Sequence, residues 1–522
     1  MKTKSLRLAG CWIVLLAIGA FVPQLSAMGL SAAAPVSGAE HIHVDAKAQG
    51  TPFPHFWEQM FGSGRAVLAL RDDYRSDLVA VRQATGFGYL RFHGIFDDDV
   101  GLFHLDGNGK PVYNFSYVDQ IYDGLIDRGI RPFVELSFMP AEMTSDPKAL
   151  QAFWYHPNIA PPKNYALWDG MISAFAHHLI ERYGIEEVSH WYFEVWNEPN
   201  GFWAGTPVRA TYFTLYDHTA RALKAVSPRL RVGGPATAQG AMVSAFLAHT
   251  HEHQVPVDFV TTHVYGDDTA QNVFHTDENI PRSDMVCRTV GKVHDEIQAS
   301  PTPKIPFIMS EFNASYANLP NVTDTVYMGP WIANTIRECA GKVDLMSYWA
   351  FSDVFEEQGV VRNPFYGGFG LIAAGRIPKP AYNAFAMLHR LGDEQLKVAS
   401  DSAIVTRRAD GALVIALWNY APSVGDGAEY KVGEPSGSER SFSIDMAALP
   451  AMAHATLWRL DPTHGNVVAA FDRMGRPDFP SREQLVQLRE AAKLGAPESL
   501  VVRNGRLDVQ IPPQGLLVIE VR

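Results

Sequence analysis

The chain has 522 residues, of which 47% are hydrophobic and 11% aromatic, and its formal net charge at pH 7 is −12. This length exceeds one ordinary domain, and the apolar content is sufficient for large cores. The excess of negative charge argues against nucleic acid and anionic membrane surfaces as partners.

The N-terminus has the pattern of an export signal. Three basic residues within the first seven precede an almost uninterrupted apolar stretch over residues 11–22, and Leu25-Ser26-Ala27 then offers small residues for cleavage. The apolar stretch is shorter than the roughly 20 residues that a membrane-spanning helix needs. We therefore expect residues 1–27 to be a signal peptide and the mature protein to be secreted or periplasmic.

Between about residues 50 and 390, eight short apolar segments are separated by longer helical patterns such as Leu167–Tyr183 and Arg209–Val226. Several of the short segments are continuous apolar runs, which is typical of buried parallel strands. Eight strand–helix units predict an α/β fold, a (β/α)8 TIM barrel over residues 50–390. The predicted strands are His55–Phe61, Tyr89–Ile95, Arg131–Phe138, Trp191–Glu198, Leu230–Pro235, Asp258–Tyr265, Pro306–Phe312 and Asp344–Phe351.

Residues 391–522 have a different pattern, in which short strands alternate with turn residues. Asp410-Gly411 is a hairpin turn signal between two of these strands. We expect an accessory antiparallel β-sandwich here, which a strand within residues 40–47 could join. Ser481–Leu494 is predicted to be a helical insertion, and residues 425–439 a mobile loop. The predicted strands are Ala403–Arg408, Leu413–Asn419, Ala455–Leu460 and Gly515–Val521.

Two cysteines, Cys287 and Cys339, remain once the signal peptide is removed. They could pair in an oxidising compartment, but their spacing does not show whether they meet, and we interpret both as buried thiols. No Cys-x-x-Cys or clustered Cys/His pattern is present. We therefore expect no metal site and no cofactor, and we interpret the histidines at 249, 251 and 253 as solvated.

Two glutamates occupy equivalent positions at the ends of predicted strands. Glu198 ends the apolar run that begins at Trp191 and is followed by Pro199, which stops the strand; Glu311 ends the run from Ile305. Active sites of TIM barrels lie at the C-terminal strand ends, and the strand count places these carboxylates on the fourth and seventh strands. The alternative is that each glutamate only caps a strand or pairs with an arginine. Two carboxylates about 5–5.5 Å apart would support glycoside hydrolysis with retained stereochemistry.

A colinear series of motifs extends well beyond this pair of glutamates. Through them, residues 55–420 resemble family 39 of the glycoside hydrolases, the family of β-xylosidases and α-L-iduronidases, and in particular its β-xylosidase branch. The motifs include Arg91-Phe92-His93-Gly94, Arg131-Pro132-Phe133-Val134-Glu135, Val232-Gly233-Gly234-Pro235, Phe351-Ser352-Asp353-Val354-Phe355-Glu356-Glu357 and Gly367-Gly368-Phe369-Gly370-Leu371.

The resemblance implies roles for individual residues. Glu198 corresponds to the general acid/base and Glu311 to the nucleophile, while Asn197 would reach the 2-hydroxyl of the sugar. Tyr265 would orient Glu311, and at least one of the two carboxylates at positions 356 and 357 would bind sugar hydroxyls. Aromatic side chains near strand ends could stack on pyranose rings or belong to the core. The candidate substrate-binding residues are His93, Asn197, Phe202, His263, Tyr265, Trp349, Glu356 and Glu357.

The expected function is that of a retaining exo-glycosidase that removes β-D-xylosyl units from short xylo-oligosaccharides. An arabinose-releasing enzyme, an α-L-iduronidase and an endo-acting glycanase are alternatives within the same chemistry. A non-catalytic carbohydrate-binding barrel is an alternative of another class. The expected partner is a small oligosaccharide, and the sequence does not determine the oligomeric state.

Overall fold

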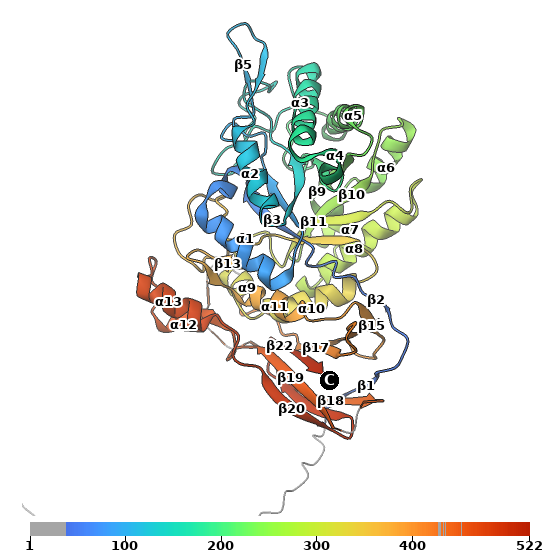
Figure 1. Ribbon diagram of the computed structural model, residues 1–522, viewed down its shortest axis with the longest axis vertical. Coiled ribbons are helices and arrows are strands. Elements are labelled where there is room, and N and C mark those ends of the chain that lie inside the picture. Colours follow the sequence, from blue (N-terminus) through green and yellow to red (C-terminus); the bar gives the residue numbers. More distant parts are fainter. Residues whose placement is uncertain (1–37, 426–429, 432, 434, 450–451) are drawn as a thin grey trace, which may run out of the picture. The chain divides into compact units, whose positions relative to one another are not determined.

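The computed structural model describes residues 38–425, 430–431, 433, 435–449 and 452–522. Eight parallel strands, each hydrogen-bonded to the next, close into a barrel, and the intervening helices lie outside it (Figure 1). The fold is therefore the expected TIM barrel. Its strands are β3 (Met60–Arg65), β4 (Tyr89–His93), β7 (Arg131–Leu136), β8 (Tyr192–Val195), β9 (Arg231–Thr237), β10 (Phe259–Tyr265), β11 (Phe307–Asn313) and β12 (Leu345–Tyr348).

The first barrel strand was placed wrongly by the sequence. The apolar run His55–Phe61 predicted a strand there, whereas β3 begins at Met60 and residues 56–59 form turns. Phe56 and Trp57 are buried all the same, because they pack in the main core cluster. The segment before the strand is therefore apolar because it packs in the core, and its sequence pattern cannot be told apart from that of a buried strand. The other seven predicted strands overlap the observed ones.

Helices α3 and α5 match the two segments that the sequence predicted, to within two residues. The first begins after Asn164, whose side chain accepts a hydrogen bond from the backbone of Ala166 and caps the helix. The helices of the barrel are α1 (Asp72–Thr85), α2 (Ser116–Ile126), α3 (Tyr165–Tyr183), α4 (Ile185–Val188), α5 (Val208–Val226), α6 (Val243–Glu252), α7 (Ala270–Phe274), α8 (Arg282–Gln298), α9 (Pro320–Thr323), α10 (Met328–Cys339) and α11 (Pro380–Leu388), with 3-10 turns η1 (Ala66–Leu70) and η2 (Ala238–Gly240).

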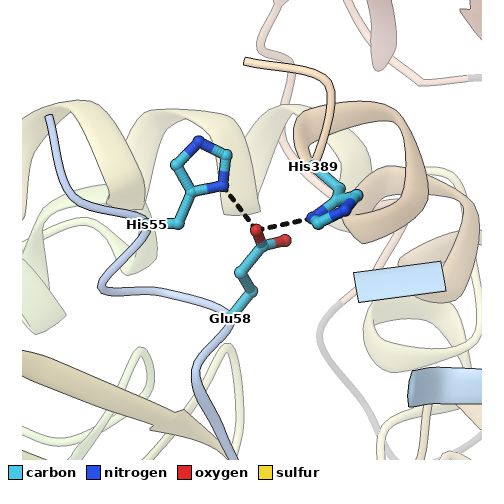
Figure 2. Close-up of side chains that lie close together, drawn as sticks. All are labelled: His55, Glu58 and His389. Atoms are coloured by element: carbon cyan, nitrogen blue, oxygen red, sulfur yellow. Dashed lines mark hydrogen bonds and ion pairs between the residues drawn. The ribbon is translucent and has the colours of Figure 1, made fainter. Parts of the chain in front are cut away.

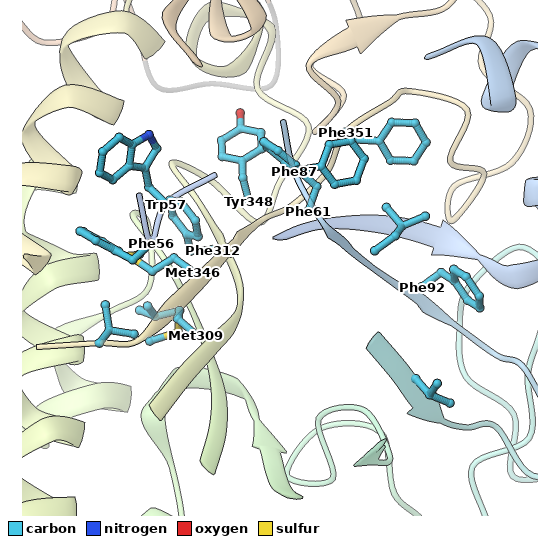
Figure 3. Close-up of a cluster of buried hydrophobic side chains, with 14 of the residues drawn as sticks. Phe56, Trp57, Phe61, Phe87, Phe92, Met309, Phe312, Met346, Tyr348 and Phe351 are labelled. Carbon is cyan, nitrogen blue, oxygen red and sulfur yellow. The ribbon is translucent and has the colours of Figure 1, made fainter. Parts of the chain in front are cut away.

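Alternate residues of the barrel strands face two different cores. Phe61 points outward and packs edge-on against Phe87 and Phe385, in the cluster drawn in Figure 3. Met60, the residue before it, belongs to a separate small cluster contributed by several strands, with Phe133, Phe259, Ile308 and Leu345. These residues lie near the starts of their strands, so they close the N-terminal end of the barrel interior.

Ten further strands form a second sheet, which is buried on both faces at its centre but exposes alternate residues on one face toward one edge. One face supplies a core of its own, to which residues such as Ile42, Ile444 and Ile519 belong. From the other face, Trp418 and Val518 join the main core cluster, where β17 and β22 contact α10. In order across the sheet, the strands are β1 (Glu40–Asp45), β18 (Arg440–Ala447), β21 (Arg506–Ile511), β20 (Glu498–Arg503), β19 (Met452–Leu460), β22 (Gly515–Val521), β17 (Leu413–Asn419), β16 (Ala403–Arg407), β15 (Glu394–Leu396) and β2 (Thr51–Pro52).

The strand expected within residues 40–47 is β1, which pairs in parallel with β18. Because strands from both ends of the sheet contribute to one core, the sheet folds over in the manner of a sandwich. The boundary at residue 390 stays a prediction, since Glu40–Arg522 forms one compact unit. The signal peptide at residues 1–27 and part of the expected loop at 425–439 lie outside the described residues.

The helical insertion in this region is larger than expected. Besides α13 (Arg482–Ala491), which a capping box of Ser481 and Gln484 starts, it contains α12 (Val467–Arg473). Two short hairpins complete the described elements: β5 (Phe103–Leu105) with β6 (Pro111–Tyr113), and β13 (Ile372–Ala373) with β14 (Ile377–Pro378). None of the helices in the described ranges is long and apolar enough to cross a membrane.

The interpretation of the two cysteines as thiols was wrong. Cys287 of α8 and Cys339 of α10, which are 52 positions apart in the sequence, form a disulfide. The helical register of each segment can be predicted, but the packing of α8 against α10, which brings the two sulfur atoms together, depends on the tertiary structure.

Candidate active site

A pocket of about 300 Å³ opens at the C-terminal ends of the barrel strands. Such a volume lies at the lower end of the range for small-molecule sites. Six of the eight candidate substrate-binding residues line it, together with both candidate catalytic glutamates; the other two, His263 and Glu356, do not. The lining residues are His93, Phe153, Asn197, Glu198, Phe202, Ala238, Gln239, Tyr265, Asp268, Glu311, Tyr316, Trp349, Glu357, Gln358 and Phe369.

Glu198 follows β8 in an unusual backbone conformation. Its φ is +44°, and its N–H donates a hydrogen bond of 2.8 Å to the carbonyl of Ala236 at the end of β9. A non-glycine residue persists in this region of φ only when its surroundings hold it there. The strand itself has already ended at Val195. The neighbouring strand thus fixes where the carboxylate of Glu198 stands.

Glu311 lies within β11, where the pairing registers with β10 and β12 both shift. Such an irregularity lets Ser310 and Glu311, although adjacent in sequence, both turn toward the barrel interior. Oε1 of Glu311 accepts a 2.6 Å hydrogen bond from Nη1 of Arg91, and Oε2 accepts one of 2.7 Å from the hydroxyl of Tyr265. Both oxygens are therefore held, as expected for Tyr265, and the carboxylate is held as an anion.

The two glutamates face one another across the pocket. An oxygen of Glu198 and an oxygen of Glu311 lie within 4.8 Å of each other, with His263 beside both. This spacing suits attack by one carboxylate on a sugar carbon while the other protonates the leaving oxygen. It is shorter than the roughly 6.5–9.5 Å that leaves room for a water molecule in inverting enzymes.

Arg91 is the central cation beneath the pocket and is fully buried. Besides Glu311, its guanidinium donates to Glu194 through Nε at 2.6 Å and to Asn197 through Nη2 at 3.0 Å, and Nη2 lies 2.8 Å from Glu135. Because Oδ1 of Asn197 accepts from Arg91, the NH2 group of that amide is left to donate within the pocket. A buried charge with this many partners holds the strand ends in one arrangement.

His93 carries the second positive charge near the site. Burial alone lowers its pKa, but the charge and hydrogen bond of Glu135 outweigh this and, with Glu357 and Glu311, raise the pKa to about 10. Nδ1 of His93 lies 2.7 Å from Glu135, and Nε2 lies 3.5 Å from Glu357 on the pocket wall. His93 is thus a protonated side chain whose other nitrogen faces the pocket.

His263 differs, because burial lowers its pKa to about 4 and the ring is neutral. Its Nδ1 lies 2.9 Å from Oε1 of Glu198, and its Nε2 lies 3.1 Å from Oγ of Ser310. The hydroxyl of Ser310 donates its single proton to Glu194 at 2.7 Å, so its oxygen must accept from Nε2–H of His263. Nδ1 then carries a lone pair, so in this contact it accepts a hydrogen bond that the protonated carboxyl of Glu198 donates.

The electrostatics favour the same protonation state of Glu198. Burial raises its pKa to about 7, against the opposing effect of His93 and Arg91, and the charges of Glu135 and Glu194 add to the rise. With this pKa, Glu198 keeps its proton in mildly acidic solution and begins to lose it near neutral pH, whereas Glu311 is bound by Arg91. Two carboxylates in different environments with different protonation states are the pattern of an acid paired with an anion.

Adjacent Glu356 and Glu357 point in different directions. Glu357 lines the pocket, whereas Glu356 has a φ of +67° and binds Arg71 at 2.5 Å and Arg65 at 3.5 Å. Of the two glutamates that the sequence left open, Glu357 is therefore the pocket residue, while Glu356 is bound by two arginines outside the pocket. His263 does not line the pocket either, and acts on it through Glu198.

Aromatic rings form much of the pocket surface. Trp349 packs against His93 with ring centroids 4.7 Å apart, and a Cβ at Gly62 would lie only 2.1 Å from the Trp349 ring, so a glycine is needed in β3. Phe202 meets Phe153 edge-on at 5.4 Å. Two other aromatics at strand ends, Phe138 and Trp203, pack against Trp196 in the core instead.

Several residues of the site were not predicted. Phe153 and Tyr316 come from loops in which no sequence pattern marks them, and Tyr316 is 58% exposed at the pocket wall. Asp268 also lines the pocket; its carboxylate accepts hydrogen bonds from the backbone N–H of Tyr265 at 2.8 Å and from the side chain of Gln239 at 2.9 Å. Arg91, Glu135 and Glu194 could have been recognised in the sequence as site residues, because they are charged residues at inward positions of apolar strands.

A TIM barrel with two facing glutamates at the ends of its fourth and seventh strands, one of them bound by a buried arginine, has the arrangement of a retaining glycoside hydrolase. The chain belongs to the glycosyl hydrolases family 39, whose model matches residues 40–506. It is 39% identical over 454 residues to a β-xylosidase of Geobacillus stearothermophilus, covering 84% of this chain and 86% of that protein.

Two solved structures extend the similarity to the fold. A monomeric β-xylosidase from Caulobacter crescentus CB15 superposes with a TM-score of 0.85 at 34% identity, covering 93% of this chain and 99% of that one. The GH39 enzyme from Xanthomonas axonopodis pv. citri gives a TM-score of 0.84 at 33% identity, covering 93% and 98%. In both, the similarity covers barrel and accessory sheet together.

Proposed function

We propose that this protein is a retaining β-xylosidase that releases xylose from the non-reducing ends of short β-xylosides. The observation that carries the proposal is the pair of facing carboxylates, within 4.8 Å of each other, of which Glu198 has a pKa raised to about 7 by burial and Glu311 is bound by Arg91. The β-xylosidases among its relatives support the choice of sugar.

The reaction proceeds in two displacements. Glu311 attacks the anomeric carbon with its carboxylate while the glycosidic C–O bond breaks, and Glu198 passes its proton to the departing oxygen. Glu311 is then an uncharged ester and Glu198 an anion. Glu198 next takes a proton from water, the resulting hydroxide oxygen bonds to the anomeric carbon, and the Glu311–sugar bond breaks. Both groups end as they began.

Other residues bind and orient the sugar. The NH2 group of Asn197 is placed to donate to the 2-hydroxyl, whose hydrogen bonds tighten in the transition state. Glu357 and protonated His93 present an acceptor and a donor to further hydroxyls, and Trp349 offers an aromatic face. The small pocket volume supports removal of a terminal sugar over cleavage within a long chain.

The pocket also bears on the alternatives. An α-L-iduronide carries a carboxylate, yet no lysine or arginine is among the described residues that line the pocket, and His93 is already bound to Glu135. An iduronidase is therefore the weaker candidate. Burial around Glu198 disfavours the ionised form of its carboxyl, which serves an acid catalyst. A non-catalytic sugar-binding barrel would not need such an arrangement.

The experiment is a comparison of initial rates on aryl β-D-xyloside, α-L-arabinopyranoside and α-L-iduronide that share one leaving group. We expect the highest kcat/KM on the xyloside. A negligible xyloside rate beside rapid hydrolysis of another glycoside would overturn the sugar assignment, while leaving the roles of Glu198 and Glu311 in place.

We also propose that the protein is exported, as a secreted or periplasmic enzyme. The predicted signal peptide supports this, and so does the Cys287–Cys339 disulfide, because disulfides persist mainly in oxidising compartments. N-terminal sequencing of the protein from the periplasm or medium should start at residue 28. An intact N-terminus on cytosolic protein would contradict the proposal.

A further inference from the structure

A second cluster of ligand-type side chains lies at the end of the barrel opposite the pocket. Oε1 of Glu58 is 2.5 Å from Nδ1 of His55 and 2.7 Å from Nδ1 of His389, as Figure 2 shows. One ligand atom of each residue lies within 4.8 Å of the other two. Both imidazole nitrogens thus point at the same carboxylate oxygen.

The three residues come from the two ends of the barrel sequence. His55 and Glu58 stand in the turn that leads into β3, the first barrel strand, and His389 caps the C-terminus of α11, the last barrel helix. Glu58 and His389 are separated by 331 positions. The cluster lies at the N-terminal face of the barrel, where residues serve stability and not catalysis.

Glu58 is a buried carboxylate whose ion pairs in the described part of the chain involve only the two histidines. Its side chain is 3% exposed, and its Oε2 atom is buried without a hydrogen-bond partner among the described residues. A buried carboxylate is stabilised by a positive charge beside it, which a bound cation would supply. His389 is 46% exposed, so the cluster can be reached from solvent.

We propose that His55, Glu58 and His389 bind a divalent transition-metal ion of the zinc type. Two histidines and one glutamate are a frequent protein ligand set for Zn²⁺, with a water molecule completing a tetrahedral site. Hard ions such as Mg²⁺ and Ca²⁺ prefer oxygen ligands throughout, so the two imidazoles select against them. The ring of His55 stacks on Trp57 at 4.5 Å, which holds its orientation.

Coordination needs only small movements. Zn²⁺ ligands at about 2.0–2.1 Å stand roughly 3.3 Å from one another in a tetrahedron, so each histidine has to move away from Glu58 by under about 1 Å. His389 has this freedom because its side chain is partly exposed. The ion replaces two hydrogen bonds to Glu58 and neutralises its charge.

The bound ion links the turn that precedes the first barrel strand to the end of the last barrel helix. It binds the native arrangement and not the unfolded chain, in which these residues are far apart, so it raises the stability of the fold by mass action. It takes no part in hydrolysis, because the pocket lies at the other end of the strands.

The experiment titrates Zn²⁺ into the full-length protein after treatment with a chelator, and records calorimetric stoichiometry, melting temperature and xyloside hydrolysis. We expect one tight equivalent per chain and a rise of roughly 2–4 °C in Tm at a hundredfold excess over Kd. Hydrolysis below the melting range should be unchanged. His389→Ala should abolish both the tight equivalent and the Tm rise while folding normally.

Two controls keep the result specific. His218→Ala removes a half-exposed histidine that pairs with Asp169, away from the proposed ligands, and it should leave zinc binding intact. Glu198, His263 and Glu311 also place ligand atoms within 4.8 Å, so Glu311→Gln tests the pocket. The proposal is overturned if no saturable equivalent appears, if His389→Ala retains it, or if Glu311→Gln loses it.

Discussion

Nδ1 of His263 lies 2.9 Å from Oε1 of Glu198 and accepts a hydrogen bond from it, because the other ring nitrogen donates to Ser310. Ser310 in turn donates to Glu194, which Arg91 holds. A chain of hydrogen bonds thus runs from the proposed acid to a fixed buried carboxylate. The direction of these hydrogen bonds stabilises the protonated form of Glu198, and burial of the carboxyl adds to this effect.

This chain predicts the pH dependence of activity. Burial raises the pKa of Glu198 to about 7, and the first displacement needs its proton, so kcat/KM should fall as pH rises through about 7. In Ser310→Ala, His263 is free to adopt the tautomer that donates Nδ1–H to Glu198 and favours the anion. The fall should then begin at lower pH, by roughly one unit.

Full pH profiles of kcat/KM on an aryl xyloside measure this shift. Ser347→Ala is the matched control, since Ser347 is a buried serine of β12 that has no hydrogen bond to His263. Identical profiles for the wild type and Ser310→Ala would show that the tautomer of His263 does not influence Glu198.

Removal of the proposed nucleophile should stop the reaction. Glu311→Gly is expected to lower kcat by at least roughly 10⁴-fold, because no covalent intermediate can form. Azide should occupy the space left by the side chain and restore turnover, giving the α-configured glycosyl azide. Glu311→Gln fills that space and should not respond to azide. Full activity of Glu311→Gly would exclude the proposed role.

Removal of the proposed acid should affect substrates according to their leaving groups. In Glu198→Ala, xylobiose should lose roughly 10²–10⁴-fold in the first displacement, whereas an aryl xyloside with an acidic phenol should lose little, since its leaving oxygen needs no proton. Burst kinetics separate the first displacement from the second. An equal loss for both substrates in the first displacement argues against the acid role of Glu198.

Lys379 is the cation of a fully buried ion cluster that lies close to the pocket. Its Nζ lies 2.7 Å from Asp324, 2.6 Å from Asp353 and 2.8 Å from the carbonyl of Gly368, which precedes the pocket residue Phe369. Lys379→Met leaves two buried carboxylates without their cation and should lower the free energy of unfolding by about 3–5 kcal/mol.

Urea unfolding measures this effect. Lys493→Met removes a lysine that pairs with Glu490 on the surface and should change the free energy of unfolding by less than about 0.5 kcal/mol. Equal values for the two variants would mean that the buried cluster contributes no more than a surface pair.

Most of the barrel and the centre of its site can be predicted from sequence, because both depend on local patterns. Continuous apolar runs locate seven strands, and a glutamate at the end of a run identifies Glu198 and Glu311. The first strand was misplaced because Phe56 and Trp57 are apolar for a different reason, as part of the core outside the barrel.

The rest depends on contacts between distant residues. Nothing local distinguishes Glu356, which two arginines hold, from Glu357, which lines the pocket. Phe153 and Tyr316 reach the pocket from loops, whose course no periodicity records. The Cys287–Cys339 bond and the Glu58–His389 contact likewise require that the helices first be packed in place.

The central claim is a double displacement by Glu198 and Glu311, and the stereochemistry of the first product tests it most directly. Proton NMR during the hydrolysis of xylobiose can record the anomeric signal of newly released xylose before mutarotation. The account predicts that β-xylose appears first and that the α-anomer follows slowly. Initial formation of α-xylose would contradict it, because that outcome requires a single displacement by water.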